Sequence, residues 1–262
     1  MKVAVTLAEM AAVDDSFEIR DNAIPEQYLE YSLNEWDEYA LEAAVQLREA
    51  DLATDVVTVT IGPDRSEETI RKGLAKGADR AVRIWDADLA DLPLLDVHTK
   101  ATLLAAALED ESPDLVLSGV QTGDDMHGAT GVALASRLGY GWAAVVSELT
   151  VKDGTELRVR RELEGGVEEV SRVELPAVCT IQTGINEPRY ASLRGIRMAQ
   201  RAEIETLALP DLGLESAGLG TSTSLEGLRE PVAESTAELL DGSATQTAGA
   251  LASILRERGV GD

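Results

Sequence analysis

The chain has 262 residues, of which 44% are hydrophobic, so one large domain or two small ones with a proper core are expected. Its 48 acidic residues against 23 basic ones give a net charge of −25, which excludes nucleic acid and anionic membrane surfaces as binding partners. A single cysteine, Cys179, excludes an internal disulfide framework and a cysteine-based zinc site.

No run of about 18 apolar residues is present, so we expect no direct membrane insertion. The N-terminus lacks the apolar stretch and cleavage site of a secretory signal, which predicts a cytoplasmic protein. Two histidines, His98 and His127, are too few for a His-rich metal site, and we expect no metal. The acidic residues are spread along a chain with only five lysines, which favours a hydrated surface suited to a salty cytoplasm over a docking face for a basic partner.

The first 140 residues alternate strand and helix patterns. Runs rich in Val and Thr indicate strands, and apolar residues at helical spacing indicate the helices between them. Strands are predicted over 3–7, 55–61, 80–84 and 114–120, and helices over 38–50, 66–76, 97–108 and 127–138. This alternation predicts a doubly wound α/β fold, a mainly parallel, Rossmann-like sheet of the adenine-nucleotide-binding type.

The pattern changes after residue 140. Residues 143–149, 156–161 and 167–174 read as strands joined by Asp153-Gly154 and Gly165-Gly166 turns, so antiparallel strands are added to the sheet. Residues 177–182 form a further apolar run. We therefore predict a nucleotide-binding α/β domain over 1–205 and a C-terminal extended arm or linker over 206–262, with a short terminal helix at 246–258.

Three segments could carry chemistry. In 119–130, GVQTGDDMHGAT, a buried strand ends in a glycine-containing loop before a helix, where ligands sit in open α/β sheets. Asp124 and Asp125 would repel a naked phosphate and suit ribose hydroxyls or helix capping, and a plain capped loop is the competing interpretation. Segment 61–79 repeats the strand–loop–helix pattern, and 186–196, NEPRYASLRGI, is either an interface loop or a surface loop whose Tyr packs on the core.

No nucleophile–base–orienter set is apparent, and Cys179 lies in an apolar stretch typical of an inert core residue. The GxGxxG and GxxxxGK[ST] phosphate loops are both absent from the sequence, which excludes the standard dinucleotide and NTPase sites. The absence of a nucleophile–base–orienter set argues against a hydrolase or a transferase.

Several motifs together resemble one family. NEPRYASLRGI at 186–196 is similar to the signature loop of the beta subunits of electron transfer flavoproteins, and the segments 34–47, 61–81, 114–140, 161–166 and 175–180 fit the same family in the same order. The resemblance covers about residues 1–205. Departures lie at Thr6-Leu7-Ala8, where a basic residue is common, at Trp36, at Gly195 and in the thinned basic run Arg197 to Arg201.

The resemblance implies an electron carrier without catalytic residues of its own. It implies a heterodimer with an alpha subunit that holds most of the FAD, while this chain holds a structural AMP. The pair would take electrons from acyl-CoA dehydrogenases and related flavoenzymes in fatty acid β-oxidation and pass them to a membrane quinone oxidoreductase.

The same resemblance implies which residues bind AMP and which recognise the dehydrogenases. The positions implied for AMP are Ala4, Asn34, Glu35, Trp36, Asp37, Ile61, Gly119, Val120, Gln121, Thr122, Gly123, Asp124, Asp125, Met126, His127, Gly128, Ala129 and Thr130. Those implied for dehydrogenase recognition are Glu187, Pro188, Arg189, Tyr190 and Leu193, with Leu193 as the apolar anchor.

Two alternatives stay open. Relatives that bifurcate electrons from NADH hold a second FAD in place of AMP, and the sequence does not show how deep the pocket is. A nucleotide-sensing module of the universal-stress type would share the sheet and the ligand position, but it leaves 186–196 without a role.

Overall fold

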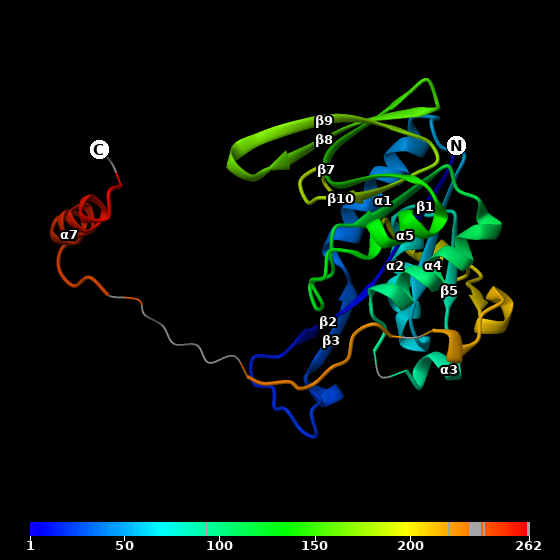
Figure 1. The fold of residues 1–262 in the computed structure, drawn as a ribbon, viewed down its shortest axis with the longest axis horizontal. Coiled ribbons are helices and arrows are strands. Elements are labelled where there is room, and N and C mark those ends of the chain that lie inside the picture. Colours follow the sequence, from blue (N-terminus) through cyan, green and yellow to red (C-terminus); the bar gives the residue numbers. More distant parts are fainter. Residues whose placement is uncertain (93, 220, 231–236, 238, 261–262) are drawn as a thin grey trace. The chain divides into compact units, whose positions relative to one another are not determined.

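A computed structural model of the chain describes residues 1–92, 94–219, 221–230, 237 and 239–260 (Figure 1). The described chain divides into two compact units, Met1–Leu228 and Arg229–Asp262. The first unit therefore extends beyond residue 205, because the segment after it adds a strand to the sheet and packs apolar side chains on the core.

Among the described residues, nine strands form one sheet in the order β11-β5-β4-β1-β6-β10-β7-β8-β9 (Figure 1). The bounds are β1 Lys2–Thr6, β4 Asp55–Ile61, β5 Arg80–Ile84, β6 Leu115–Gly119, β7 Gly141–Lys152, β8 Glu156–Leu163, β9 Val167–Glu174, β10 Ala177–Ile181 and β11 Glu205–Leu207. The strands from β11 to β7 pair in parallel, and β8 and β9 continue the sheet in antiparallel register. This confirms the predicted fold class.

Helices cover both faces of the parallel part. Their bounds are α1 Glu35–Glu49, α2 Glu67–Lys76, α3 Ala87–Ala90, α4 Val97–Glu111, α5 Thr130–Leu138 and α6 Leu193–Ala199. Because side chains alternate along a strand, Val3 and Val5 of β1 join the core that contains α1 and α2, while Ala4 joins the core that contains α4 and α5. Two apolar layers thus enclose the sheet, as the continuous Val-rich strands require.

The antiparallel extension follows its turn chemistry. Asp153 and Gly154 between β7 and β8 both have positive φ, as do Gly165 and Gly166 between β8 and β9. Such turns match the twist of antiparallel strands. A second, two-stranded sheet of β2 Glu9–Val13 and β3 Leu29–Leu33 was not expected from the sequence.

Two predicted elements differ from the structure. The helix predicted over 127–138 begins only at Thr130, because Met126 and Gly128 adopt positive φ and cannot belong to its first turn. His127 therefore precedes the helix instead of opening it. The predicted loop 186–196 ends in helix α6, whose cap is the Ser192 hydroxyl, which accepts a hydrogen bond from the amide of Gly195 at 3.0 Å.

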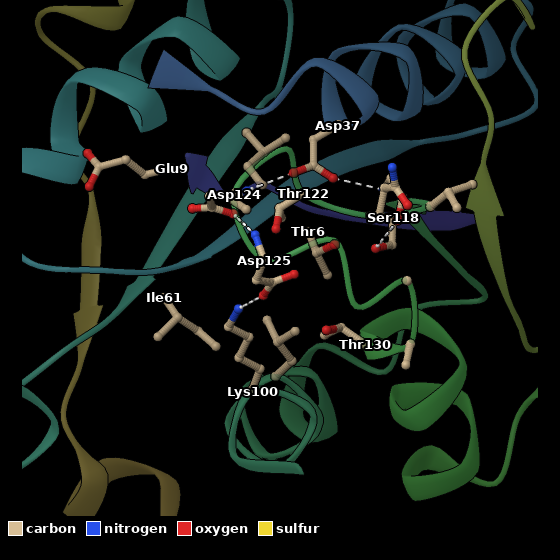
Figure 2. A pocket seen from close by; sticks show the side chains of 18 of the residues that line it. Thr6, Glu9, Asp37, Ile61, Lys100, Ser118, Thr122, Asp124, Asp125 and Thr130 are labelled. Carbon is tan, nitrogen blue, oxygen red and sulfur yellow. Dashed lines mark hydrogen bonds and ion pairs between the residues drawn. The ribbon is translucent and has the colours of Figure 1, made fainter. Parts of the chain in front are cut away.

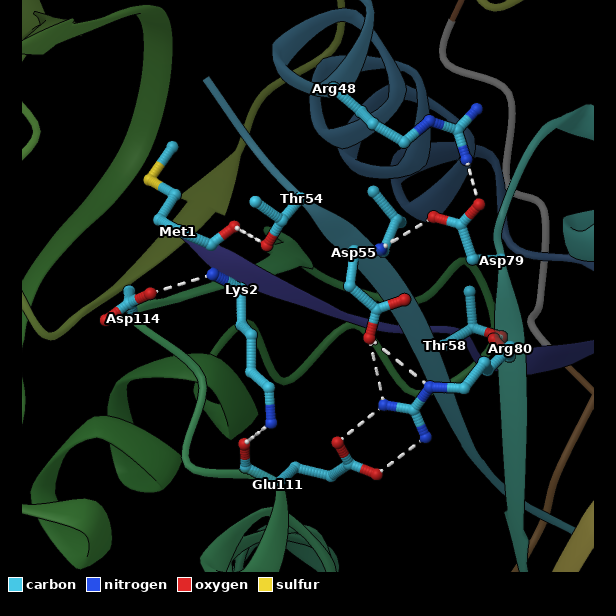
Figure 3. Close-up of polar contacts among 11 residues, drawn as sticks. Met1, Lys2, Arg48, Thr54, Asp55, Thr58, Asp79, Arg80, Glu111 and Asp114 are labelled. Atoms are coloured by element: carbon cyan, nitrogen blue, oxygen red, sulfur yellow. Dashed lines mark hydrogen bonds and ion pairs between the residues drawn. The ribbon is translucent and has the colours of Figure 1, made fainter. Parts of the chain in front are cut away.

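A polar network ties the amino ends of the parallel strands together (Figure 3). Arg80 at the start of β5 donates to Asp55 at the start of β4 and to Glu111 at the end of α4. Asp79 accepts from the amide of Val56, at 2.9 Å, and pairs with the Arg48 guanidinium. These contacts join β4, β5, α1 and α4 at the amino ends of the strands.

The segment after β11 lies on the α4 side of the sheet. Leu209 and Leu219 are almost fully buried there. The Asp96 carboxylate caps α4 through the amide of Thr99 and also accepts hydrogen bonds from Ser222 and Thr223. In the second unit, the helix predicted over 246–258 is α7 Ala244–Glu257, with Leu251 and Leu255 exposed.

Candidate functional site

A cleft opens at the carboxyl ends of β1, β4 and β6 (Figure 2). From β1 the chain adds β4 and then β5 on one side, while β6 and β10 lie on the other. β1 is therefore the point where the strand order reverses, and open α/β sheets bind ligands outside the strand ends at such a point. The cleft is open at its mouth, and its walls come from the ends of β1, β4 and β6 and from α4.

The structure brings most of the sequence-predicted nucleotide positions together in this cleft. Those that line it are Asp37, Ile61, Gly119, Val120, Gln121, Thr122, Asp124, Asp125, Gly128, Ala129 and Thr130. They come from the start of α1, the end of β4 and the loop between β6 and α5. The loop after β6 supplies most of this wall.

Other predicted positions lie outside the lining. Ala4 is fully buried within β1, Glu35 is exposed on α1, and Gly123, Met126 and His127 are exposed on the loop after β6. At Gly123, an added Cβ would lie 2.4 Å from the Met10 sulfur, so this glycine faces the β2 strand.

The Asn34–Asp37 turn supports the cleft from behind. Asn34 is fully buried and donates from Nδ2 to the carbonyl of Gln121 at 2.9 Å, which fixes the loop after β6. Trp36 is half-buried, and its indole donates to Gln182 at 3.2 Å. A Cβ on Gly119 would lie 2.6 Å from the Cβ of Trp36, so glycine is required here for the approach of α1 to β6 and not for the approach of a ligand.

Asp37 is a buried carboxylate at the wall of the cleft. Its Oδ2 accepts from the amide of Ala8 and its Oδ1 from the amide of Gly119, each at 2.8 Å. Burial raises the pKa of Asp37 to about 6, and the two amide hydrogen bonds oppose that shift without cancelling it. The carboxylate therefore joins the ends of β1 and β6 to the start of α1.

The loop after β6 places two carboxylates at the mouth. Asp124 accepts from the amide of Ala11 on β2 at 3.2 Å, and Asp125 pairs with Lys100 of α4 and accepts from the amide of His127. Burial raises the pKa of Asp125, but the hydrogen bonds from Lys100 and from the amide of His127, together with the charge of Lys100, outweigh burial, and the pKa falls to about 2. Neither carboxylate caps α5, which corrects the expected capping role: the N-cap is Ala129, whose side chain forms no cap hydrogen bond.

Sequence reasoning missed part of the lining. The additional residues are Thr6, Leu7, Ala8, Glu9, Val59, Leu95, Lys100 and Leu104, with Ser118 just before the predicted loop segment. Thr6 and Val59 could have been found, because they lie near the carboxyl ends of predicted parallel strands, where ligands gather. Lys100 gave no such signal, since a lysine inside a predicted helix reads as a solvated residue.

The segment 186–196 forms a second, separate surface. Tyr190 and Leu193 are 98% and 78% exposed, so the Tyr does not pack on the core. Arg189 instead folds back on α1: its Nε donates to Glu42 at 2.8 Å, and the same guanidinium donates to Glu49. Glu187 is exposed and Pro188 half-buried, and the most exposed apolar side chains of the segment are those of Tyr190 and Leu193, with Ile196 exposed to a smaller extent.

No described group of His, Cys, Asp and Glu side chains could hold a metal ion. Burial raises the pKa of Cys179 to about 12, and its thiol is fully buried in the core, as predicted. No helix in the described part of the chain is long and apolar enough to cross a membrane.

The model of the electron transfer flavoprotein domain matches residues 21–212. The chain is 41% identical to the electron transfer flavoprotein subunit beta of Methylophilus methylotrophus, over 98% of both chains. The chain belongs to the electron transfer flavoprotein family. It is also 40% identical to the subunit beta of Bradyrhizobium diazoefficiens, over 70% of this chain and 71% of that one, and 39% identical to that of Homo sapiens, over 71% and 72%.

The electron transfer flavoprotein match includes both candidate surfaces. Residues 21–212 contain the Asn34–Asp37 turn, the loop after β6 and the exposed Tyr190 and Leu193. Of the lining, only the residues at the end of β1 and the start of β2 lie before this range. Most of the cleft lining and the whole of the 186–196 segment thus lie within the matched residues. The family match confirms the resemblance drawn from the motifs.

Proposed function

We propose that this chain is the beta subunit of an electron-carrying heterodimer. Its partner would be an alpha subunit that holds most of the FAD, and the pair would carry electrons from acyl-CoA dehydrogenases and related flavoenzymes to a membrane quinone oxidoreductase. The observation that supports this is the similarity over 98% of both chains to an electron transfer flavoprotein subunit beta. The FAD would supply the redox chemistry, while this chain would bind AMP and recognise the dehydrogenases.

The cleft would hold AMP. Leu7, Val59 and Leu104 give it an apolar wall suited to an adenine ring, and the hydroxyls of Thr6, Ser118 and Thr130 also face it. The amides of the first turn of α5 have no side-chain cap, so they are available to a phosphate. The donor set thus fits an adenine nucleotide without a glycine-rich phosphate loop.

Mass spectrometry of the small molecules released from the co-expressed complex tests this assignment. Equal amounts of FAD and AMP support the proposal. Two FAD per complex and no AMP would instead identify a bifurcating flavoprotein with a second flavin on this chain, which NADH-dependent reduction would then show. A homodimer that binds ATP and takes up no flavin partner would favour a nucleotide-sensing module.

Residues 186–196 would recognise the dehydrogenases. Leu193 is the apolar side chain most suited to a partner's pocket, because it projects from the first position of α6 while Arg189 holds the segment on α1. We expect Leu193→Ala to slow electron uptake from a dehydrogenase at least about tenfold, with FAD content unchanged. Leu52→Ala, an exposed leucine in the turn after α1, is the matched control. Normal rates in Leu193→Ala would remove the anchor role.

A further inference from the structure

Lys100 is an unusual side chain in this chain. The sequence has only five lysines among 262 residues, and Lys100 faces the cleft from α4. Among the described residues that line the cleft, it is the single basic one, against four carboxylates, those of Glu9, Asp37, Asp124 and Asp125. Its half-buried ammonium pairs with Asp125 across the cleft, as Figure 2 shows.

The other three carboxylates already have partners elsewhere. Glu9 pairs with Arg65 at 2.9 Å, Asp37 accepts from two backbone amides, and Asp124 accepts from the amides of Ala11 and Asp125. None of these partners offers a cation to a ligand inside the cleft. An anionic ligand therefore finds one ammonium group, and that group is shared with Asp125.

We propose that Lys100 determines the affinity of the cleft for the phosphate of its ligand, and that Asp125 competes with that phosphate for the ammonium. This inference rests on the proposed adenine nucleotide function. Lys100, Asp125 and Thr130 at the start of α5 all face the same cleft, so a phosphate at the uncapped first turn of α5 lies on the wall that carries the ion pair (Figure 2). The amides orient the phosphate, and Lys100 supplies the charge that the acidic surroundings lack.

The competition gives the two partners opposite effects. Without Lys100, the phosphate meets only amides, hydroxyls and carboxylates, so its affinity falls. Without the charge of Asp125, the ammonium is free for the phosphate and one repulsive group is gone, so affinity rises. An ion pair that only holds α4 against the loop after β6 predicts something else, since loss of either partner would then loosen the cleft for any ligand.

The test is calorimetric titration of the co-expressed, FAD-loaded complex after its adenine nucleotide has been dialysed away. The probes are AMP and adenosine, which differ by the phosphate. Lys100→Met keeps the alkyl stem, and Asp125→Asn keeps an oxygen to accept from His127. Lys72→Met, on the exposed face of α2, is the control for removal of a lysine charge.

We expect Lys100→Met to weaken AMP at least about tenfold, or about 1.4 kcal/mol, and to leave adenosine unchanged. Asp125→Asn should tighten AMP severalfold, and Lys72→Met should change neither ligand. The dependence of AMP affinity on KCl should also be shallower in Lys100→Met, because one charge pair is lost.

Two results would overturn the inference alone. One is equal weakening of AMP and adenosine by Lys100→Met, and the other is weaker AMP binding by Asp125→Asn; both describe a structural tether. A wild-type complex that binds neither probe would overturn the proposed nucleotide function itself, together with the inference. Thermal unfolding of each variant complex shows whether a loss of binding comes from a loss of fold.

Discussion

At the scale of single residues, buried charge is used to fix loops at the ends of strands. Asp37 of α1 accepts hydrogen bonds from the amides of Ala8, just after β1, and Gly119, at the end of the neighbouring strand β6. An asparagine has one acceptor oxygen, so it cannot accept from both amides, and its own N–H would face a donor. Removing one partner of a buried hydrogen bond costs about 1–3 kcal/mol, and we expect Asp37→Asn to destabilise the fold by that much at neutral pH.

The same carboxyl makes a predictable contribution to the pH dependence of stability. Burial raises the pKa of Asp37 from 3.8 to about 6, so between these values the folded state binds more protons than the unfolded state. The contribution of this carboxyl to the free energy of unfolding is therefore largest below about pH 4 and is lost as the pH rises through about 6. Denaturant unfolding should show the advantage of wild type over Asp37→Asn to be larger at pH 5 than at pH 7.5, by on the order of 1 kcal/mol.

Asp15→Asn in the exposed connection between β2 and β3 serves as the control, since it removes a carboxylate of the same kind from the surface. Its effect should be small at both pH values. If the difference between wild type and Asp37→Asn grew with pH instead, the carboxyl would be ionised more readily in the fold than in the unfolded chain, against the burial argument.

Arg189 compensates a second buried carboxylate. Glu42 on α1 has a side chain only 5% exposed, and the guanidinium of Arg189 donates to it and to Glu49. Removing one partner of a buried acceptor costs about 1–3 kcal/mol, so Arg189→Met should destabilise the chain by roughly that amount. Arg172→Met, whose side chain is 79% exposed, should cost little. Similar midpoints in urea for the two variants would show that Glu42 finds another partner.

At the scale of elements, the position of α6 depends on one glycine. A Cβ on Gly195 would lie 2.4 Å from the carbonyl oxygen of Ala75 on α2, so the two helices touch backbone to backbone. Arg71 of α2 holds the far end of α6 by donating to the carbonyl of Ala199 at 2.6 Å. α6 is thus clamped at both ends against α2, and Leu193 is presented from a fixed base.

We expect Gly195→Ala to push α6 away from α2, because a backbone carbonyl cannot yield as a side chain does. The cost should be about 1–3 kcal/mol of unfolding free energy, the usual penalty for overpacking. Electron uptake from a dehydrogenase should slow as well, since Leu193 moves with the helix. Gly218→Ala, where the new Cβ meets nothing within 4 Å, should leave both properties near wild type. Unchanged uptake in a destabilised Gly195→Ala would separate the helix position from recognition.

The elements that the sequence predicts are those with a strong local pattern. The Val- and Thr-rich run of β4 and the apolar face of α1 can be recognised from a short stretch of sequence. The β2–β3 sheet shows no such pattern, because Glu9–Val13 and Leu29–Leu33 are partly exposed and are joined by a long connection without a tight-turn signature. Lys100 lines the cleft because of how α4 packs on the sheet, and the sequence around Lys100 does not predict that packing.

At the scale of the whole molecule, two electrostatic effects oppose each other. The net charge of −25 destabilises a compact state by self-repulsion, while many acidic residues are paired with arginine. Most of these pairs have at least one partner a third or more exposed, as in Arg160 with Glu148 and Arg172 with Glu156. Exposed pairs contribute about 0–1 kcal/mol each, and the uncompensated excess of acid acts over the entire surface.

The balance of these effects predicts the response to salt. Screening shortens the Debye length from about 10 Å in 0.1 M salt to about 3 Å in 1 M. This removes long-range repulsion, while the exposed pairs that salt also weakens contribute little at the outset. We therefore expect Tm to rise by roughly 5 °C or more over that range, equivalent to a few kcal/mol. KCl and NaCl should act alike, because screening depends on ionic strength and not on the cation. A fall in Tm with salt would mean instead that the attraction within the arginine pairs outweighs the repulsion from the excess of acidic charge.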